Sequence, residues 1–227
     1  MGAVLDLVRV LFSPGEVFER VRERPKFLLP WIGLSVVIIV IAYLMMPYTQ
    51  AAIASRLAQV AQQNPQAAAN AAKFQAVGIL LAPIFLLVGL LIGAALLWLL
   101  VTLFAGGDGK FVTLLSVTTY TAVPTILLQV AGLIVLKMKG LDAISSPDDL
   151  RPPLGLNLLA PSAGGFVGAL LAGINPFAIW ALVLTAIGVQ VTHKTSKGSA
   201  YTVAIVATVL GVLISAGLAS LGGGGGK

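Results

Sequence analysis

Few residues of this chain could do acid–base or metal chemistry, and they do not cluster. His193 is the only histidine, and there is no cysteine. Asp148 and Asp149 are adjacent but lie in a proline-rich segment, where carboxylates are usually solvated or cap a turn. A metal or catalytic site needs several convergent ligands or an acid–base pair. We therefore predict no catalytic residue, no metal site and no cofactor, and we expect that the protein is not an enzyme.

The remaining polar residues are uncharged and lie within apolar runs. In the run 114–136, several fall roughly on one helical face: Thr118, Thr121, Thr125 and Gln129. One interpretation is a polar groove that includes Tyr120, Pro124 and Gln129. The other is hydrogen bonding between helices, worth about 0.6–2 kcal/mol per bond, with Pro124 kinking the helix. The sequence leaves both open.

Asn175 and Pro176 stand at the start of an apolar run without charges. Asn is a favoured N-cap and Pro is favoured at the first helical position, so the pair predicts a capped helix start. The alternative is a broken membrane helix whose freed backbone groups line a binding site.

Gly89 and Gly93 are four residues apart in another apolar run. Small residues at this spacing let membrane helices approach closely. The pair therefore predicts a helix–helix contact, either within the chain or between chains.

The composition identifies an integral membrane protein. Of the 227 residues, 58% are hydrophobic and 10% are charged, with a mean hydropathy of +1.01. Soluble domains carry about 25% charged residues, so most of this surface must face lipid. The net charge of +6 comes from basic residues between apolar runs. Their expected partner is the lipid bilayer with its anionic headgroups, and we expect no nucleic acid.

About 20 apolar residues are needed to cross a bilayer. We predict an all-α, polytopic membrane domain over residues 28–221, with five spans: 28–47, 77–104, 114–136, 176–192 and 200–221. Residues 48–74 should form a helical hairpin, and 222–227 a flexible glycine tail. The short stretch 164–174 favours an interfacial or re-entrant segment, although six crossings stay open around 154–192.

Residues 1–27 are expected to form cytoplasmic amphipathic helices on the membrane surface. Ser13, Pro14 and Glu16 fit the N-cap, N1 and N3 positions of a capping box. Five basic residues precede the first span: Arg9, Arg20, Arg22, Arg24 and Lys26. This bias favours an N-terminus inside.

Several short motifs follow one another along the chain: Phe12–Phe18 with Arg24-Pro25, Tyr120 with Pro124, Asn175-Pro176-Phe177 with Trp180 and Gly188, and Ser196-Lys197 with Ala200. In this order they resemble the membrane domain of the Yip family of Rab/Ypt-GTPase-interacting proteins, in its bacterial branch. The resemblance implies a five-helix membrane domain with a cytoplasmic N-terminus, and for a bacterial member we expect the cytoplasmic membrane. Eukaryotic members act in vesicle trafficking through Rab GTPases. Only about 27 residues precede the first span here, so we do not expect a GTPase partner.

These observations favour a non-enzymatic membrane scaffold or adaptor that self-associates or binds other membrane proteins in membrane organisation or trafficking. The alternative is a transporter or channel-like carrier of a neutral or lipidic solute, because no charged residue lies in the predicted spans.

Overall fold

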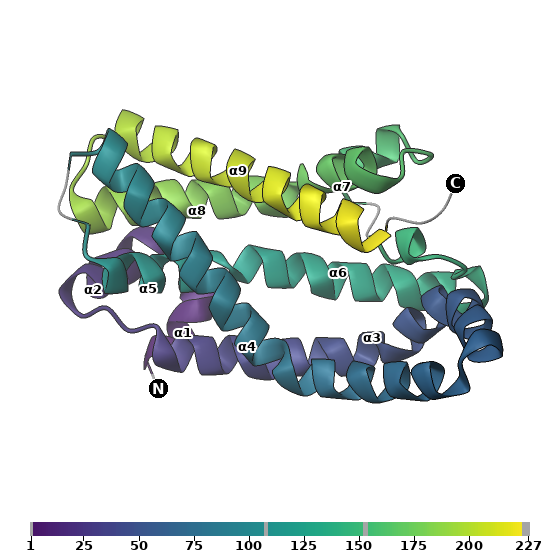
Figure 1. Cartoon of the computed structure of the whole chain (residues 1–227). Coiled ribbons are helices and arrows are strands. Elements are labelled where there is room, and N and C mark those ends of the chain that lie inside the picture. Colours follow the sequence, from purple (N-terminus) through teal and green to yellow (C-terminus); the bar gives the residue numbers. More distant parts are fainter. Residues whose placement is uncertain (1, 107–108, 152–153, 224–227) are drawn as a thin grey trace.

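The computed structural model describes residues 2–106, 109–151 and 154–223, and every regular element in this part of the chain is a helix (Figure 1). The α-helices are α1 (Gly2–Arg9), α2 (Pro14–Glu23), α3 (Leu28–Gln63), α4 (Pro65–Phe104), α5 (Phe111–Thr121), α6 (Val123–Lys139), α7 (Gly165–Gly173), α8 (Pro176–His193) and α9 (Lys197–Gly223). Three short 3₁₀-helices, Leu141–Ala143, Pro147–Leu150 and Leu156–Leu159, lie between α6 and α7.

Five helical segments among the described residues are long and apolar enough to cross a membrane: Leu28–Ser55, Val77–Phe104, Phe111–Lys139, Pro176–His193 and Lys197–Ser220. The predicted all-α membrane fold is therefore confirmed. The nine residues of α7 make a helix about 14 Å long, too short for a hydrocarbon core of about 30 Å. Of the expected glycine tail, α9 includes residues 222 and 223, and 224–227 lie outside the described residues.

Pro47 and Pro124 have different effects on the helices that contain them. Helix α3 continues through Pro47 to Gln63, past the predicted end of the first span. Beyond the proline, Tyr48 and Ala52 pack in a buried cluster with Leu133 of α6, and this packing holds the next turns helical. In the third span the α-helix is interrupted at Ala122, directly before the first turn of α6, which contains Pro124.

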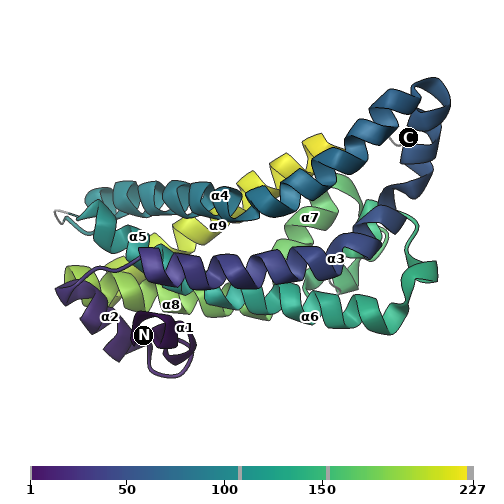
Figure 2. The same ribbon diagram turned by 90° about the horizontal axis from the view of Figure 1, so that it is seen from below.

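The hairpin between α3 and α4 turns at a single residue. Asn64 ends α3, and its side-chain Oδ1 accepts a hydrogen bond of 3.0 Å from the backbone N–H of Ala67 in the first turn of α4. Pro65 follows at the first helical position, where its missing N–H costs nothing. The tip of this hairpin projects at one end of the bundle (Figure 2).

Helix α4 runs diagonally across the bundle. About midway along its length α4 lies beside the first turn of α3, where Trp31 Nε1 donates a 3.2 Å hydrogen bond to the carbonyl oxygen of Pro83. At its other end α4 lies beside α9 (Figures 1 and 2). There Leu97 and Val101 share a buried cluster with Val203 of α9. Because α3 and α9 do not lie side by side, α4 cannot contact both of them along its whole length. It therefore separates from α9 in its middle part.

The two N-terminal helices expected from the sequence are present, but their apolar faces have different surroundings. On α2, Val17 and Phe18 are fully buried in the largest core cluster, together with Leu184 of α8 and Val117 of α5. Helix α2 begins at Pro14 as expected, yet Ser13 makes no side-chain capping bond. The α1 helix instead leaves several apolar side chains exposed: Val4, Leu5 and Val8, with Phe12 just beyond the helix.

A carboxylate organises the segment after α6. The Oδ2 atom of Asp149 accepts hydrogen bonds from the backbone N–H groups of Ser145 (2.9 Å) and Ser146 (2.8 Å). These bonds favour the ionised form and hold the pKa of Asp149 below its ordinary value of 3.8. Asp149 thus caps a turn, as expected for a carboxylate in this proline-rich segment.

Replacing Gly188 by alanine should destabilise the protein by roughly 1–3 kcal/mol through overpacking. A Cβ atom there would lie 2.7 Å from Val117 Cγ1 and 3.1 Å from Phe18 Cζ, so α2 or α5 must shift. Thermal unfolding in detergent, followed by circular dichroism, measures the change. Gly217→Ala is the control, because a Cβ at Gly217 meets no neighbour within 4 Å. Equal stability of the two variants would contradict the packing of α2 against Gly188.

The turn capped by Asp149 should weaken at acidic pH. A depressed pKa means that the stabilisation is present above the ordinary value of 3.8 and is lost as pH falls through the lowered pKa. Carbon-13 NMR of the Asp149 carboxyl group measures the titration. A midpoint at or above 3.8 would show that the two backbone donors do not hold the carboxylate.

Candidate functional site: a hydroxyl-lined groove between α4 and α9

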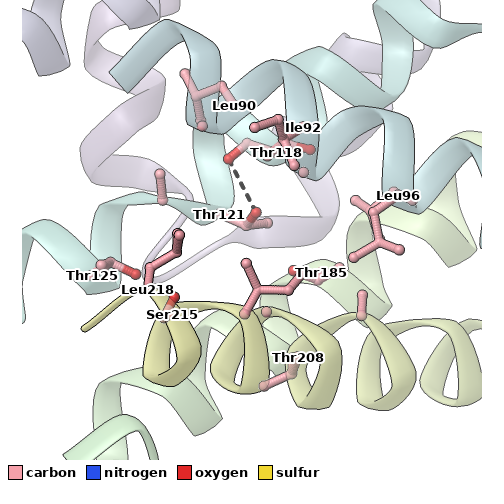
Figure 3. A pocket seen from close by; sticks show the side chains of 17 residues that line it. Leu90, Ile92, Leu96, Thr118, Thr121, Thr125, Thr185, Thr208, Ser215 and Leu218 are labelled. Atoms are coloured by element: carbon pink, nitrogen blue, oxygen red, sulfur yellow. Dashed lines mark hydrogen bonds between the residues drawn. The ribbon is translucent and has the colours of Figure 1, made fainter. Parts of the chain in front are cut away.

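A groove of about 470 Å³ lies where α4 and α9 separate (Figure 3). One wall comes from residues 89–97 of α4 and the other from residues 207–218 of α9. The junction of α5 and α6, together with Thr185 of α8, closes the groove between these walls. All these segments belong to candidate spans, so the groove lies within the membrane-spanning part of the protein.

Six hydroxyl side chains line this groove: Thr118, Thr121, Thr125, Thr185, Thr208 and Ser215. Three donate to carbonyl oxygens of their own helix: Thr118 to Leu114 (2.9 Å), Thr121 to Thr118 (3.2 Å, dashed in Figure 3) and Thr185 to Ala181 (2.8 Å).

The other three hydroxyls, those of Thr125, Thr208 and Ser215, have no hydrogen-bond partner among the described residues. An unpartnered hydroxyl is costly where no water can solvate it. These three groups can therefore donate to, or accept from, a polar group that enters the groove.

Small residues let an occupant come close to the backbone on both walls. Gly89 and Gly93 face the groove from α4, and Ala207, Gly211 and Ser215 recur every four residues on α9. A Cβ atom at Gly89 or Gly211 would meet no neighbouring atom within 4 Å. At Gly93 it would lie 3.0 Å from Thr118 Cγ2, so Gly93 packs against α5 within the chain. The contact predicted for Gly93 is thus internal, whereas Gly89 faces open space.

The rim of the groove is apolar and exposed. Ile92 on α4 and Ile214 and Leu218 on α9 are each more than half exposed. In a bilayer these side chains face lipid or a neighbouring protein, so the groove opens sideways into the membrane.

Only part of the predicted polar face lines the groove. Tyr120 points away from it, and its hydroxyl donates a 3.2 Å hydrogen bond to the backbone oxygen of Ala3 in α1. Pro124 is buried beside the break between α5 and α6, and Gln129 is exposed on α6 outside the groove. The structure therefore does not bring Tyr120, Pro124 and Gln129 together with the hydroxyls.

Asn175 joins the end of α7 to the start of α8. Its Oδ1 atom accepts a 2.9 Å hydrogen bond from Ala178 N–H, while Nδ2 donates to the oxygen of Ala172 at 2.9 Å. Pro176 occupies the first helical position. Neither residue lines the groove. The side chain of Asn175 itself satisfies the backbone groups that a helix break would otherwise offer to a ligand.

The α9 wall is the part that sequence reasoning missed: Thr208, Gly211 and Ser215, with Thr185 of α8. The spacing of Ala207, Gly211 and Ser215 is the signal that could have found it, because small residues four apart mark a helix-packing face. The groove itself follows from the separation of α4 and α9, which no local pattern reveals.

The site can offer hydrogen bonds and close packing. No titratable side chain lines the groove, and the described residues contain no group of three or more potential metal ligands. The donor set therefore fits a neutral polar or apolar occupant.

The chain is similar to known proteins over nearly its whole length. A sequence model of the Yip1 domain matches residues 8–219, nearly the whole chain. The membrane protein YknW of Bacillus subtilis is 29% identical over 215 residues, which cover 92% of this chain and 87% of YknW. No solved structure is significantly similar to the chain.

Replacing Asn175 by alanine should cost about 1–3 kcal/mol of stability, because the N–H of Ala178 loses its cap and the carbonyl oxygen of Ala172 loses its donor. Thermal unfolding in detergent measures this cost. Asn175→Ser is the matched variant, since serine retains the N-cap acceptor and should recover part of the loss. An alanine variant as stable as the original chain would contradict the junction role.

Proposed function

The chain belongs to the Yip1 domain family, and from this premise we propose that it is a non-enzymatic scaffold that holds other membrane proteins through their transmembrane helices. Family membership and five apolar helices make it an integral membrane protein. The observation that carries the proposal is the groove between α4 and α9, which combines small residues with unpartnered hydroxyls at membrane depth.

A helix suits this groove better than acyl chains do. Between membrane helices there is no hydrophobic driving force, so association depends on close packing and on hydrogen bonds across the interface. Gly89 and Gly211 allow close packing on both walls, and Ser215 offers a hydrogen bond. An acyl chain could fill the space but could not satisfy the hydroxyls. A partner helix that carries Ser, Thr or Asn would do both.

We also propose a bacterial cytoplasmic membrane with the N-terminus inside. Similarity to a Bacillus membrane protein and the basic residues ahead of α3 support this placement. A role outside catalysis is supported by the Yip1 domain not being a known enzyme family and by the groove holding no titratable group.

A carrier of a neutral or lipidic solute is the second candidate. Ligand pockets in proteins measure about 300–1,000 Å³, and the groove, at about 470 Å³, lies in that range. This proposal requires the same hydroxyls to bind a solute, so it predicts a bound small molecule where the scaffold predicts a bound protein.

Filling the groove should release the partner without unfolding the scaffold. Leucine at Gly89 or at Gly211 enters space that the chain leaves open, so the fold should persist while a partner helix is excluded. A photo-crosslinking amino acid in place of Ile92, on the rim, reports the contact in intact membranes. We expect a discrete crosslinked product that falls at least tenfold in either leucine variant.

Gly217→Leu is the matched control, because Gly217 also faces open space but does not line the groove. Purification in mild detergent with native mass spectrometry then gives the stoichiometry. A fixed complex that survives Gly217→Leu and is lost in Gly211→Leu supports the scaffold. A monomer with a bound lipid or small molecule, and no crosslink at Ile92, would contradict it and favour the carrier.

A further inference from the structure

A second cavity, of about 300 Å³ and lined mainly by charged residues, lies among the N-terminal helices. The first turns of α1 and the last turns of α2 form its walls, and Tyr120 lines it from the bundle. Its charged lining consists of Asp6, Arg20, Glu23, Arg24 and Lys26. This cavity shares no lining residue with the groove between α4 and α9.

One ion pair holds the two N-terminal helices together in this cavity. Asp6 is buried and accepts hydrogen bonds from Arg20, at 2.8 Å from Nη2 and 3.3 Å from Nε. Arg9 lies 3.6 Å from the same carboxylate. Asp6 is therefore neutralised by its own neighbours and does not repel an anion.

Two basic residues at the mouth are left without a carboxylate partner. Arg24 and Lys26 are exposed, and neither forms an ion pair with any described residue. Because Arg20 offsets Asp6, and Glu23 supplies only one further negative charge, the cavity keeps a net positive charge. An anion that enters it meets two free cations.

The cavity also lies at the level where a helix passes from water into lipid. Lys26 is followed at once by apolar, exposed side chains of α3: Leu28, Leu29 and Ile32. The side chain of Leu7 in α1 packs against Gly33 of α3, since a Cβ atom added to Gly33 would lie 3.2 Å from it. Gly33 is about 7 Å further along α3 than Leu28. Amphipathic surface helices bury their apolar face about 5–10 Å into the headgroup boundary, and the position of α1 beside Gly33 matches that depth.

We infer that this cavity binds the phosphate-bearing headgroup of an anionic phospholipid. Arg24 and Lys26 contact the phosphate, and the acyl chains run down the exposed apolar face of α3. The exposed side chains Val4, Leu5 and Val8 place α1 in the same leaflet beside the lipid. The bound lipid fixes to the membrane the two N-terminal helices that the Asp6–Arg20 pair holds together.

Native mass spectrometry of the full chain tests this with phosphatidylglycerol and phosphatidylcholine as probes. Each basic residue at an anionic surface contributes a factor of about five, so Arg24→Gln with Lys26→Gln should weaken phosphatidylglycerol binding roughly thirtyfold. Lys137→Gln with Lys139→Gln removes the same charge from the end of α6 and is the matched control. That control should retain phosphatidylglycerol binding, and neither variant should alter phosphatidylcholine binding.

Several results would overturn the inference. Equal weakening in both double variants would show a general charge effect. Equal binding of the two lipids would remove the headgroup's role. Displacement of phosphatidylglycerol by millimolar inorganic phosphate would assign the cavity to a soluble phosphate. The groove variants do not touch this cavity, so the lipid site and the scaffold proposal fail independently.

Discussion

The diagonal course of α4 determines the rest of the architecture. The helix is tied to α3 by the short hairpin at one end and, about midway, by the hydrogen bond from Trp31 to Pro83, and at its other end it packs on α9 around Val101. Since α3 and α9 are different neighbours at different points along α4, the helix does not contact both along its whole length. It must separate from α9 in the middle, and the groove is the space that this separation leaves. A site therefore arises from packing geometry, without any charged or reactive side chain.

Backbone and hydroxyl groups inside a membrane need partners within the protein, and most of this chain supplies them locally. Asn64 and Asn175 each cap the helix that a following proline begins, and Thr185 donates to its own helix. Against this pattern, the hydroxyls of Thr125, Thr208 and Ser215 in the groove have no partner within the described residues. In the proposed scaffold, a partner helix supplies the missing hydrogen bonds. Polar contacts also hold the N-terminal helices: Asp6 of α1 pairs with Arg20 of α2, and Tyr120 of α5 donates to the backbone oxygen of Ala3 in α1.

The sequence predicts the spanning helices well because run length and apolarity are local properties. It also predicts the helix start at Pro176, where the Asn-Pro pair acts within one turn. It could not show that Tyr120 turns toward Ala3, 117 positions away, nor that Tyr48 and Ala52 hold α3 helical beyond Pro47. Such features depend on contacts between distant segments. For the same reason Thr118 was identified on a polar face, while the wall it meets on α9 was not.

The most direct test of the scaffold is a cryo-electron microscopy map of the protein extracted with its neighbours in a lipid–polymer particle, with a bound antibody fragment to aid alignment. The account predicts a helical rod of foreign density between α4 and α9, in close contact with Gly89 and Gly211 and within hydrogen-bonding distance of Ser215. Density of acyl chains alone in the groove, or α4 and α9 closed against each other, would contradict it.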